Sequence, residues 1–274
     1  MTSFAIRIVV LIAYTLGNLA LILVDGSQNY MLYTIMRSIS QMALPLVCFL
    51  VVEGFYRTSN RRKYFFTFVF FGCISEVPFM FMSMEGLKIV ESAIHTYLGA
   101  DAPFNAQSLK QLRELVGLEE FAYYYDIYVN KSTAVINGML TIAVNLLMLF
   151  LIDKIKEKYF GKKMFPYVAL TSLTMIGTII VLNLVFFEEP ILITLLVSMF
   201  YFLRGNKPAI SVMMLLAVVT FYIDISLLYA IGAIVSVLLI YTYKGKEGTK
   251  KYKYWFYIYY PAHMAVIYMV TKLL

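Results

Sequence analysis

Charged residues and cysteines are scarce in this chain. Of its 274 residues, 14% are charged and 61% are hydrophobic, whereas a soluble domain usually carries about 25% charged and about 45–50% apolar residues. The shortage of charge therefore argues against one large soluble core. The only two cysteines, Cys48 and Cys73, lie inside apolar runs, which excludes a disulfide scaffold and a cysteine-based zinc site. The sequence also has no glycine-rich phosphate loop and no obvious internal repeat.

Long apolar runs, by contrast, recur from one end of the chain to the other. Crossing about 30 Å of hydrocarbon requires ~20 helical residues at about 1.5 Å each. Nine windows reach or approach that length: 4–24, 32–52, 64–82, 133–152, 165–187, 190–203, 208–223, 225–243 and 255–273. The sixth and seventh are short, so they either cross a thinned bilayer or form a re-entrant pair. The pattern predicts an all-α polytopic transmembrane helix bundle of about nine spans, or of seven if that pair does not cross.

The placement of charge predicts how this bundle lies in the membrane. Basic residues cluster after each even-numbered window, and acidic residues occupy the intervening loops, among them Asp25, Glu188 and Asp224. Positive charge is retained on the cytoplasmic side of a membrane. Nine alternating spans with a cytoplasmic N-terminus explain the pattern without exception. Residues 1–274 then form a single integral membrane domain in a lipid bilayer.

One predicted loop is long. Residues 83–131 follow the third window and lie on the outer face by the charge argument. Within this loop, Leu109, Leu112 and Leu115 repeat at a helical period. We expect an extracytoplasmic loop that carries an amphipathic helix on the membrane surface, with the tyrosines at 123–125 at headgroup level. A lid packed on the bundle is the alternative.

Four ionisable side chains lie clearly inside the predicted spans: Arg37, Glu53, Glu76 and His263. Such groups cost several kcal/mol in hydrocarbon unless they are paired or wet, so each is a candidate site residue. By helical rise, Arg37 and Glu76 lie at a similar depth, roughly 7 Å below the outer surface, and we predict that they pair across neighbouring helices. Glu53 lies at the cytoplasmic end of its span, where it can cap the basic loop that follows.

His263 is the most specific of these candidates. It lies about eight residues, or ~12 Å, into the last span. Pro261 precedes it by two residues, and its missing N–H can open a polar pocket. An imidazole takes and returns a proton near neutrality; the alternative is a packed, hydrogen-bonded histidine. One buried histidine does not make a metal site, so no metal is expected.

Five stretches of the chain, in this order, resemble the TraX family of multi-span bacterial membrane proteins: 37–64, 74–79, 130–154, 188–207 and 256–268. The most specific parts are the block EGFYRTSNRRKY and the final YPAH. The resemblance implies a protein of the bacterial inner (cytoplasmic) membrane. It also implies transfer of an acetyl group from cytoplasmic acetyl-CoA to an amine or hydroxyl acceptor on a peptide or protein. The family pilin is acetylated at its N-terminal amine.

This implied activity gives the candidate residues expected roles. His263 is the predicted general base, Arg37 steadies the oxyanion, and Glu53 and Glu76 complete the catalytic set. Basic side chains of the cytoplasmic loops are suited to the phosphates of coenzyme A. These are Arg57, Arg61, Arg62, Lys63 and Lys253. No nucleic-acid partner is expected.

The chain departs from the family pattern at three places, and these departures support two other hypotheses. Asp-His is usual at Tyr14 and Thr15, Gly-Arg at Ser40 and Gln41, and Asp-x-Gly at the positions of Glu188 and Pro190. The second hypothesis is therefore a non-catalytic membrane partner or accessory protein that has lost the catalytic residues. The third is a transporter, because the short segments near Pro190 and Pro208 resemble the broken helices of substrate sites.

Overall fold

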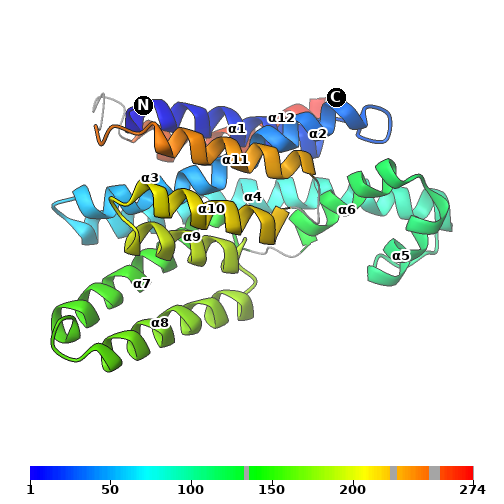
Figure 1. The fold of residues 1–274 in the computed structure, drawn as a ribbon. Coiled ribbons are helices and arrows are strands. Elements are labelled where there is room, and N and C mark those ends of the chain that lie inside the picture. The colour runs from blue at the N-terminus through cyan, green and yellow to red at the C-terminus, as the bar shows by residue number, and fades with distance from the viewer. Residues whose placement is uncertain (133–135, 223–226, 247–253, 274) are drawn as a thin grey trace.

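The computed structural model describes residues 1–132, 136–222, 227–246 and 254–273. Twelve α-helices cover these residues, and no strand occurs among them, so the all-α class is confirmed. In chain order the helices are α1 (Ser3–Leu23), α2 (Tyr30–Ser40), α3 (Ala43–Arg57), α4 (Arg61–Leu98), α5 (Ala106–Leu115), α6 (Leu118–Ser132), α7 (Gly138–Tyr159), α8 (Met164–Leu184), α9 (Pro190–Phe202), α10 (Lys207–Tyr222), α11 (Leu227–Tyr241) and α12 (Trp255–Leu273). Most of them run side by side along one bundle (Figure 1).

Helices form in all nine apolar windows. Five segments are long and apolar enough to cross a membrane: Ser3–Leu23, Tyr30–Arg57, Arg61–Leu98, Gly138–Tyr159 and Met164–Leu184. Shorter apolar helices lie in α9 and α10, as the short sixth and seventh windows led us to expect, and also in α11. The helices therefore fit a lipid bilayer, while the count of nine spans and the cytoplasmic N-terminus stay predictions.

The second window is not one continuous helix. α2 ends at Ser40 and α3 begins at Ala43, and the Gln41 N–H between them bonds to the carbonyls of Arg37 and Ser38. α11 approaches here so closely that a Cβ on Gly232 would lie 1.7 Å from the Ser38 carbonyl oxygen. A side chain at this position would collide with backbone, so the contact requires glycine. This contact holds α2 against α11, one residue from Arg37.

The basic turns gather at one end of the bundle, which we call the basic end (Figure 1, left). The Met1 ammonium donates to the Thr242 carbonyl at 2.6 Å, and Arg57 Nη2 donates to the Gly245 carbonyl at 2.8 Å. The α3–α4, α7–α8 and α9–α10 turns lie at the same end. These are the turns that the charge pattern assigned to one side of the membrane.

The predicted loop 83–131 is mostly helical and forms a lobe at the opposite end of the bundle (Figure 1, right). α4 continues without a break to Leu98, well past the end of the third window at residue 82. Val90 and Ile94 on this extension pack against α5 and α6. The apolar face of the extended α4 therefore supplies a protein surface that the two helices cover.

The expected surface helix within this loop is wrong in two respects. It is two helices, α5 and α6, with Val116 and Gly117 between them. Tyr123 and Tyr124 are buried in the lobe, and of the three tyrosines only Tyr125 is exposed, so the headgroup position fails for the first two. The segment packs against the bundle, in agreement with the alternative hypothesis of a lid.

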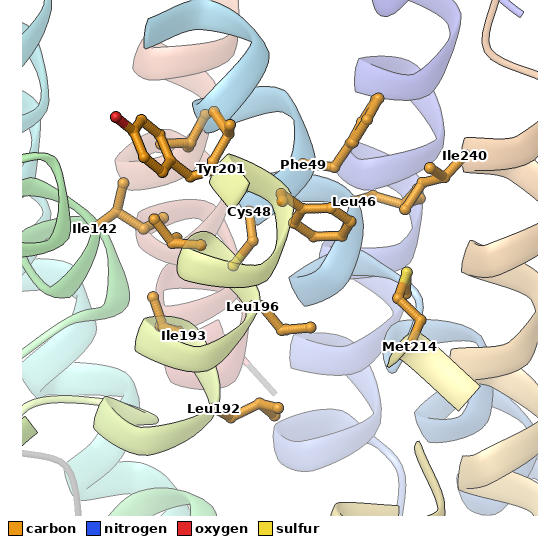
Figure 2. Packing of buried hydrophobic residues seen from close by; sticks show 14 of the residues in the cluster. Leu46, Cys48, Phe49, Ile142, Leu192, Ile193, Leu196, Tyr201, Met214 and Ile240 are labelled. Atoms are coloured by element: carbon orange, nitrogen blue, oxygen red, sulfur yellow. The ribbon is translucent and has the colours of Figure 1, made fainter. Parts of the chain in front are cut away.

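The largest apolar core lies between α3, α7 and α9. Figure 2 shows Cys48 and Phe49 from α3 beside Ile193 and Leu196 from α9, with Ile142 of α7 close by. α9 is short but central, since most of its residues are buried. α8 has the opposite character because most of its apolar side chains are exposed, as a lipid-facing helix requires.

Candidate functional site

An elongated cavity of about 230 Å³ runs along α1. On this helix its wall extends from Arg7 to Leu21, about 20 Å by helical rise. Residues of α2, α3, α4 and α12 complete the wall, with the end of α6, the start of α7, the turn before α9 and the first residues of α9. Of the predicted catalytic residues, Arg37 and His263 line this cavity, whereas Glu53 and Glu76 are not in its wall.

His263 is the last residue of α12 in the cavity wall. Its Nδ1 lies 2.9 Å from the Tyr259 carbonyl oxygen, and its Nε2 lies 3.0 Å from Asn18 Nδ2. A carbonyl only accepts, so Nδ1 carries the proton, and in the neutral ring Nε2 keeps a lone pair that accepts from the Asn18 amide. Tyr259 stacks on the ring at 5.2 Å, and the edge of Tyr14 meets it at 6.1 Å. The imidazole is therefore held in one tautomer and one orientation.

Arg37 pairs with Asp126 of α6, and not with Glu76 as predicted. Its Nε lies 2.7 Å from Oδ2, and its Nη2 lies 3.1 Å from Oδ1. The Tyr229 hydroxyl and the Asn130 amide also donate to this carboxylate, at 3.0 and 2.8 Å. Burial alone would raise the pKa of Asp126, but the Arg37 charge and these hydrogen bonds hold it below its ordinary value. This pair fastens the outer lobe to the bundle.

Glu76 instead supports the start of α7. Its Oε1 accepts from the backbone N–H of Asn137 at 2.9 Å and from the Asn137 side-chain amide at 2.6 Å. Asn137 in turn caps α7, accepting from the N–H groups of Met139 and Leu140. The predicted pair with Arg37 failed because Glu76 faces this helix end, while Arg37 faces the lobe.

Glu53 holds the basic end together. Its carboxylate forms ion pairs with Arg57 and Arg204, both at 3.0 Å, and accepts from the Tyr243 hydroxyl at 3.3 Å. These contacts join α3, the α9–α10 turn and the residues after α11. The capping role expected for Glu53 agrees with this position.

The basic side chains suggested for coenzyme A lie in different surroundings. Arg57 is paired with Glu53, and Arg61 is paired with Asp153 and stacks over Phe55. Arg62 and Lys63 are exposed, and Lys253 lies outside the described residues. Arg7, which the sequence did not single out for this role, lines the cavity near the basic end and lies over Phe256 at 5.3 Å.

The far end of the cavity is polar, and sequence reasoning missed most of it. This polar end consists of Asn130, Lys131, Glu188 and Glu189. Lys131 is 7% exposed, and its ammonium lies 5.9 Å from the Phe79 ring. Burial lowers the pKa of the Lys131 amine to about 8. These residues lie in or beside the predicted loops, and their position along the chain did not indicate that they line a cavity.

The two glutamates of the polar end come from the turn before α9. Glu188 Oε2 accepts the backbone N–H of Gly138 at 2.6 Å, at the start of α7. Glu189 has a left-handed backbone with φ 46°, which is strained for a residue with a side chain. Partial burial raises the pKa of the Glu188 carboxyl, whereas the Glu189 side chain is exposed. One signal was available for this site, because Lys131, Glu188 and Glu189 stand at the start of two TraX-like stretches, 130–154 and 188–207.

Positions that depart from the usual TraX pattern also surround His263 or line the cavity. Tyr14 lines the cavity and contacts the imidazole, and Thr15 shares a hydrogen bond of 2.7 Å with the Tyr259 hydroxyl. Ser40 and Gln41 line the same cavity. Gly17 lets α1 approach Ser40, because a Cβ there would lie 2.6 Å from the serine Cβ. The departures therefore concern the wall of one site.

Comparison with known protein families decides the relationship. The family described as "TraX protein" matches residues 4–95 and 105–271. The chain belongs to the TraX family. A TraX-like relative is the "Probable fimbrial assembly protein FimC, serogroup H1" of Dichelobacter nodosus, 38% identical over 79 residues. That match covers 28% of this chain and 31% of the relative, so the chain spans about a third of its length. No solved structure matches the chain.

Proposed function

We propose that this TraX protein is a membrane-bound acyltransferase that moves an acetyl group from acetyl-CoA to an amine or hydroxyl acceptor. The observation that carries the proposal is the tautomer-fixed imidazole of His263 in the wall of an elongated cavity. One end of that cavity lies near the basic end and the other at the lobe. We expect the protein in the bacterial cytoplasmic membrane, with its basic end toward the cytosol.

The donor enters at the basic end in this proposal. Leu11, Val47 and Leu50 line that part of the cavity, and such a narrow apolar passage suits the extended pantetheine arm of coenzyme A. Arg7 in the cavity wall and the exposed Arg62 and Lys63 at the start of α4 form no ion pair among the described residues. We assign these three side chains to phosphate, since Arg57 and Arg61 are already ion-paired. When bound, acetyl-CoA supplies the activated thioester carbonyl.

The chain's own residues then handle the proton and the developing charge. The acceptor N–H or O–H first replaces the Asn18 amide as the hydrogen-bond partner of His263 Nε2. The imidazole then takes the proton of that group. The acceptor atom bonds to the acetyl carbon, the carbon–sulfur bond breaks, and the proton passes to the thiolate of coenzyme A. Arg37 binds Asp126 through Nε and Nη2, and its Nη1 donates a long hydrogen bond of 3.4 Å to the Ser40 hydroxyl. In this proposal Nη1 also donates to the oxyanion.

This proposal is tested by adding labelled acetyl-CoA to membranes that contain the protein and measuring the transfer of label. We expect transfer of label to an acceptor, and a loss of about 100-fold or more in His263→Ala, as for removal of a general base. His95→Ala is the matched control, because this second histidine lies on α4 outside the cavity wall. Transfer no greater than in empty membranes, or full activity in His263→Ala, would contradict the proposal.

The alternative is an accessory role without catalysis. The FimC relative is named as a probable fimbrial assembly protein, which favours this role. It predicts a stoichiometric partner that co-purifies equally with the parent protein and with His263→Ala. A partner retained in the absence of any acetyl transfer would favour this alternative.

A further inference from the structure

Among the described residues, the charges at the polar end of the cavity form no ion pairs with one another. Arg37 is balanced by Asp126. In the part of the chain that the structure describes, however, no carboxylate lies within ion-pair distance of Lys131, and no cationic nitrogen lies within that distance of Glu188 or Glu189. Opposite charges thus line one cavity without contact between them.

Such an arrangement is costly for the folded protein. A buried ammonium loses its hydration, and the face of the Phe79 ring replaces only part of it. Partial burial likewise disfavours the charged form of Glu188. Glu189 is exposed, but it holds a strained backbone. A ligand that supplies both missing charges would remove these costs, because each charge then gains a partner of opposite sign.

Building on the proposed function, we infer that the acceptor is a zwitterion with a primary ammonium close to an anionic group. Glu188 and Glu189 hold the ammonium, and Lys131 holds the anion. Phosphoethanolamine, whether free or as a lipid headgroup, has this chemistry. An uncharged hydroxyl acceptor would leave all three side chains unmatched, so the inference also selects an amine over a hydroxyl.

The reaction balances with these residues. The bound ammonium gives one proton to a glutamate carboxylate, and the resulting amine attacks the thioester carbonyl. The second proton goes to His263 Nε2 and then to the departing thiolate. The products are the N-acetyl amide, coenzyme A with its thiol, and one proton released by the glutamate. The amide has no positive charge, so it no longer pairs with Glu188 and Glu189 and leaves the site.

A binding experiment without acetyl-CoA tests the inference separately from catalysis. The full chain is placed in phosphatidylglycerol nanodiscs, and its melting temperature is measured against phosphoethanolamine, ethanolamine and inorganic phosphate. A ligand that binds only the folded state raises that temperature by mass action. We expect phosphoethanolamine to bind at least about tenfold more tightly than either half-ligand, since it engages both charges.

Variants identify the site. Lys131→Met and Glu189→Gln should each weaken phosphoethanolamine binding by about tenfold or more. Lys88→Met and Glu91→Gln are the matched controls, since both residues are exposed on the lobe; they should bind as the parent does. The inference would be overturned if Lys131→Met bound phosphoethanolamine as tightly as the parent does. It would also be overturned if phosphoethanolamine stabilised the parent neither in phosphatidylglycerol nor in phosphatidylethanolamine nanodiscs.

Phosphatidylethanolamine nanodiscs identify the source of the ligand. A higher melting temperature in that lipid, lost in Lys131→Met, supports a lipid headgroup. A shift that requires the free compound in both lipids supports a soluble acceptor. Binding without acetyl transfer would leave this inference standing while the acyltransferase proposal fails. If the protein transferred acetyl to an amine that has no anionic group and did not bind the zwitterion, the acyltransferase proposal would stand and this inference would fail.

Discussion

The two ends of this bundle differ in whether their charged side chains form ion pairs. At the basic end, Glu53 is shared between Arg57 and Arg204. At the polar end, Lys131, Glu188 and Glu189 line a cavity without ion pairs among the described residues. An ionisable residue in an apolar segment is therefore not a functional group by its position alone. A charged residue that is ion-paired within the fold has a structural role, whereas one without such a partner is a candidate for binding a ligand.

The Arg37–Asp126 pair near the polar end is buried and held by two hydrogen bonds, and breaking it should have the largest effect. Asp126→Asn leaves a buried guanidinium without a counter-charge, so we expect destabilisation by about 3–5 kcal/mol. The melting temperature of the purified protein measures this loss. Asp101→Asn, an exposed change of the same kind, is the control. Equal melting temperatures in the two variants would mean that the lobe is not anchored by this pair.

Lys131→Met should act in the opposite direction, because it removes a buried charge that has no ion-pair partner among the described residues. Burial makes the charged form of Lys131 unfavourable by roughly 1–3 kcal/mol near neutral pH, so we expect the variant to be more stable than the parent by a similar amount. The folded-state pKa of Lys131, about 8, lies below the ordinary value of 10.5. Between these values the unfolded chain binds a proton that the folded chain has released, so the parent gains stability as pH rises.

The test for Lys131 is therefore a series of melting curves from pH 7 to pH 10. The stability gap between Lys131→Met and the parent should be widest below pH 8 and should narrow above it. A gap that stays constant over this range would show that the amine does not titrate there.

Glu53→Gln should have the smallest effect of the three. Its partners Arg57 and Arg204 are partly exposed, and such pairs contribute about 1 kcal/mol or less. Acetyl transfer should survive, because Glu53 is not in the cavity wall. A loss of transfer as large as in His263→Ala would instead return Glu53 to the catalytic set.

The polar residues of the spans were only partly interpretable in advance. His263 and Arg37 were identified because each is ionisable within an apolar run, and both line the cavity. The partner of Arg37 was misassigned, since depth along a helix does not reveal which neighbour a side chain faces. Lys131 and Glu188 were missed because they lie at the edges of apolar runs, where sequence alone cannot separate a solvated charge from one that lines a cavity.

Local pattern was enough to determine the all-α class, the positions of the apolar helices and the two candidates His263 and Arg37. Helix formation depends on residues a few positions apart, so the chain carries this information segment by segment. Tertiary structure alone decided the partners of the charges. Arg37 and Asp126 are 89 residues apart, and Glu188 meets Gly138 across 50. Contacts of this range depend on how each helix is rotated and packed against the others, which no local pattern records.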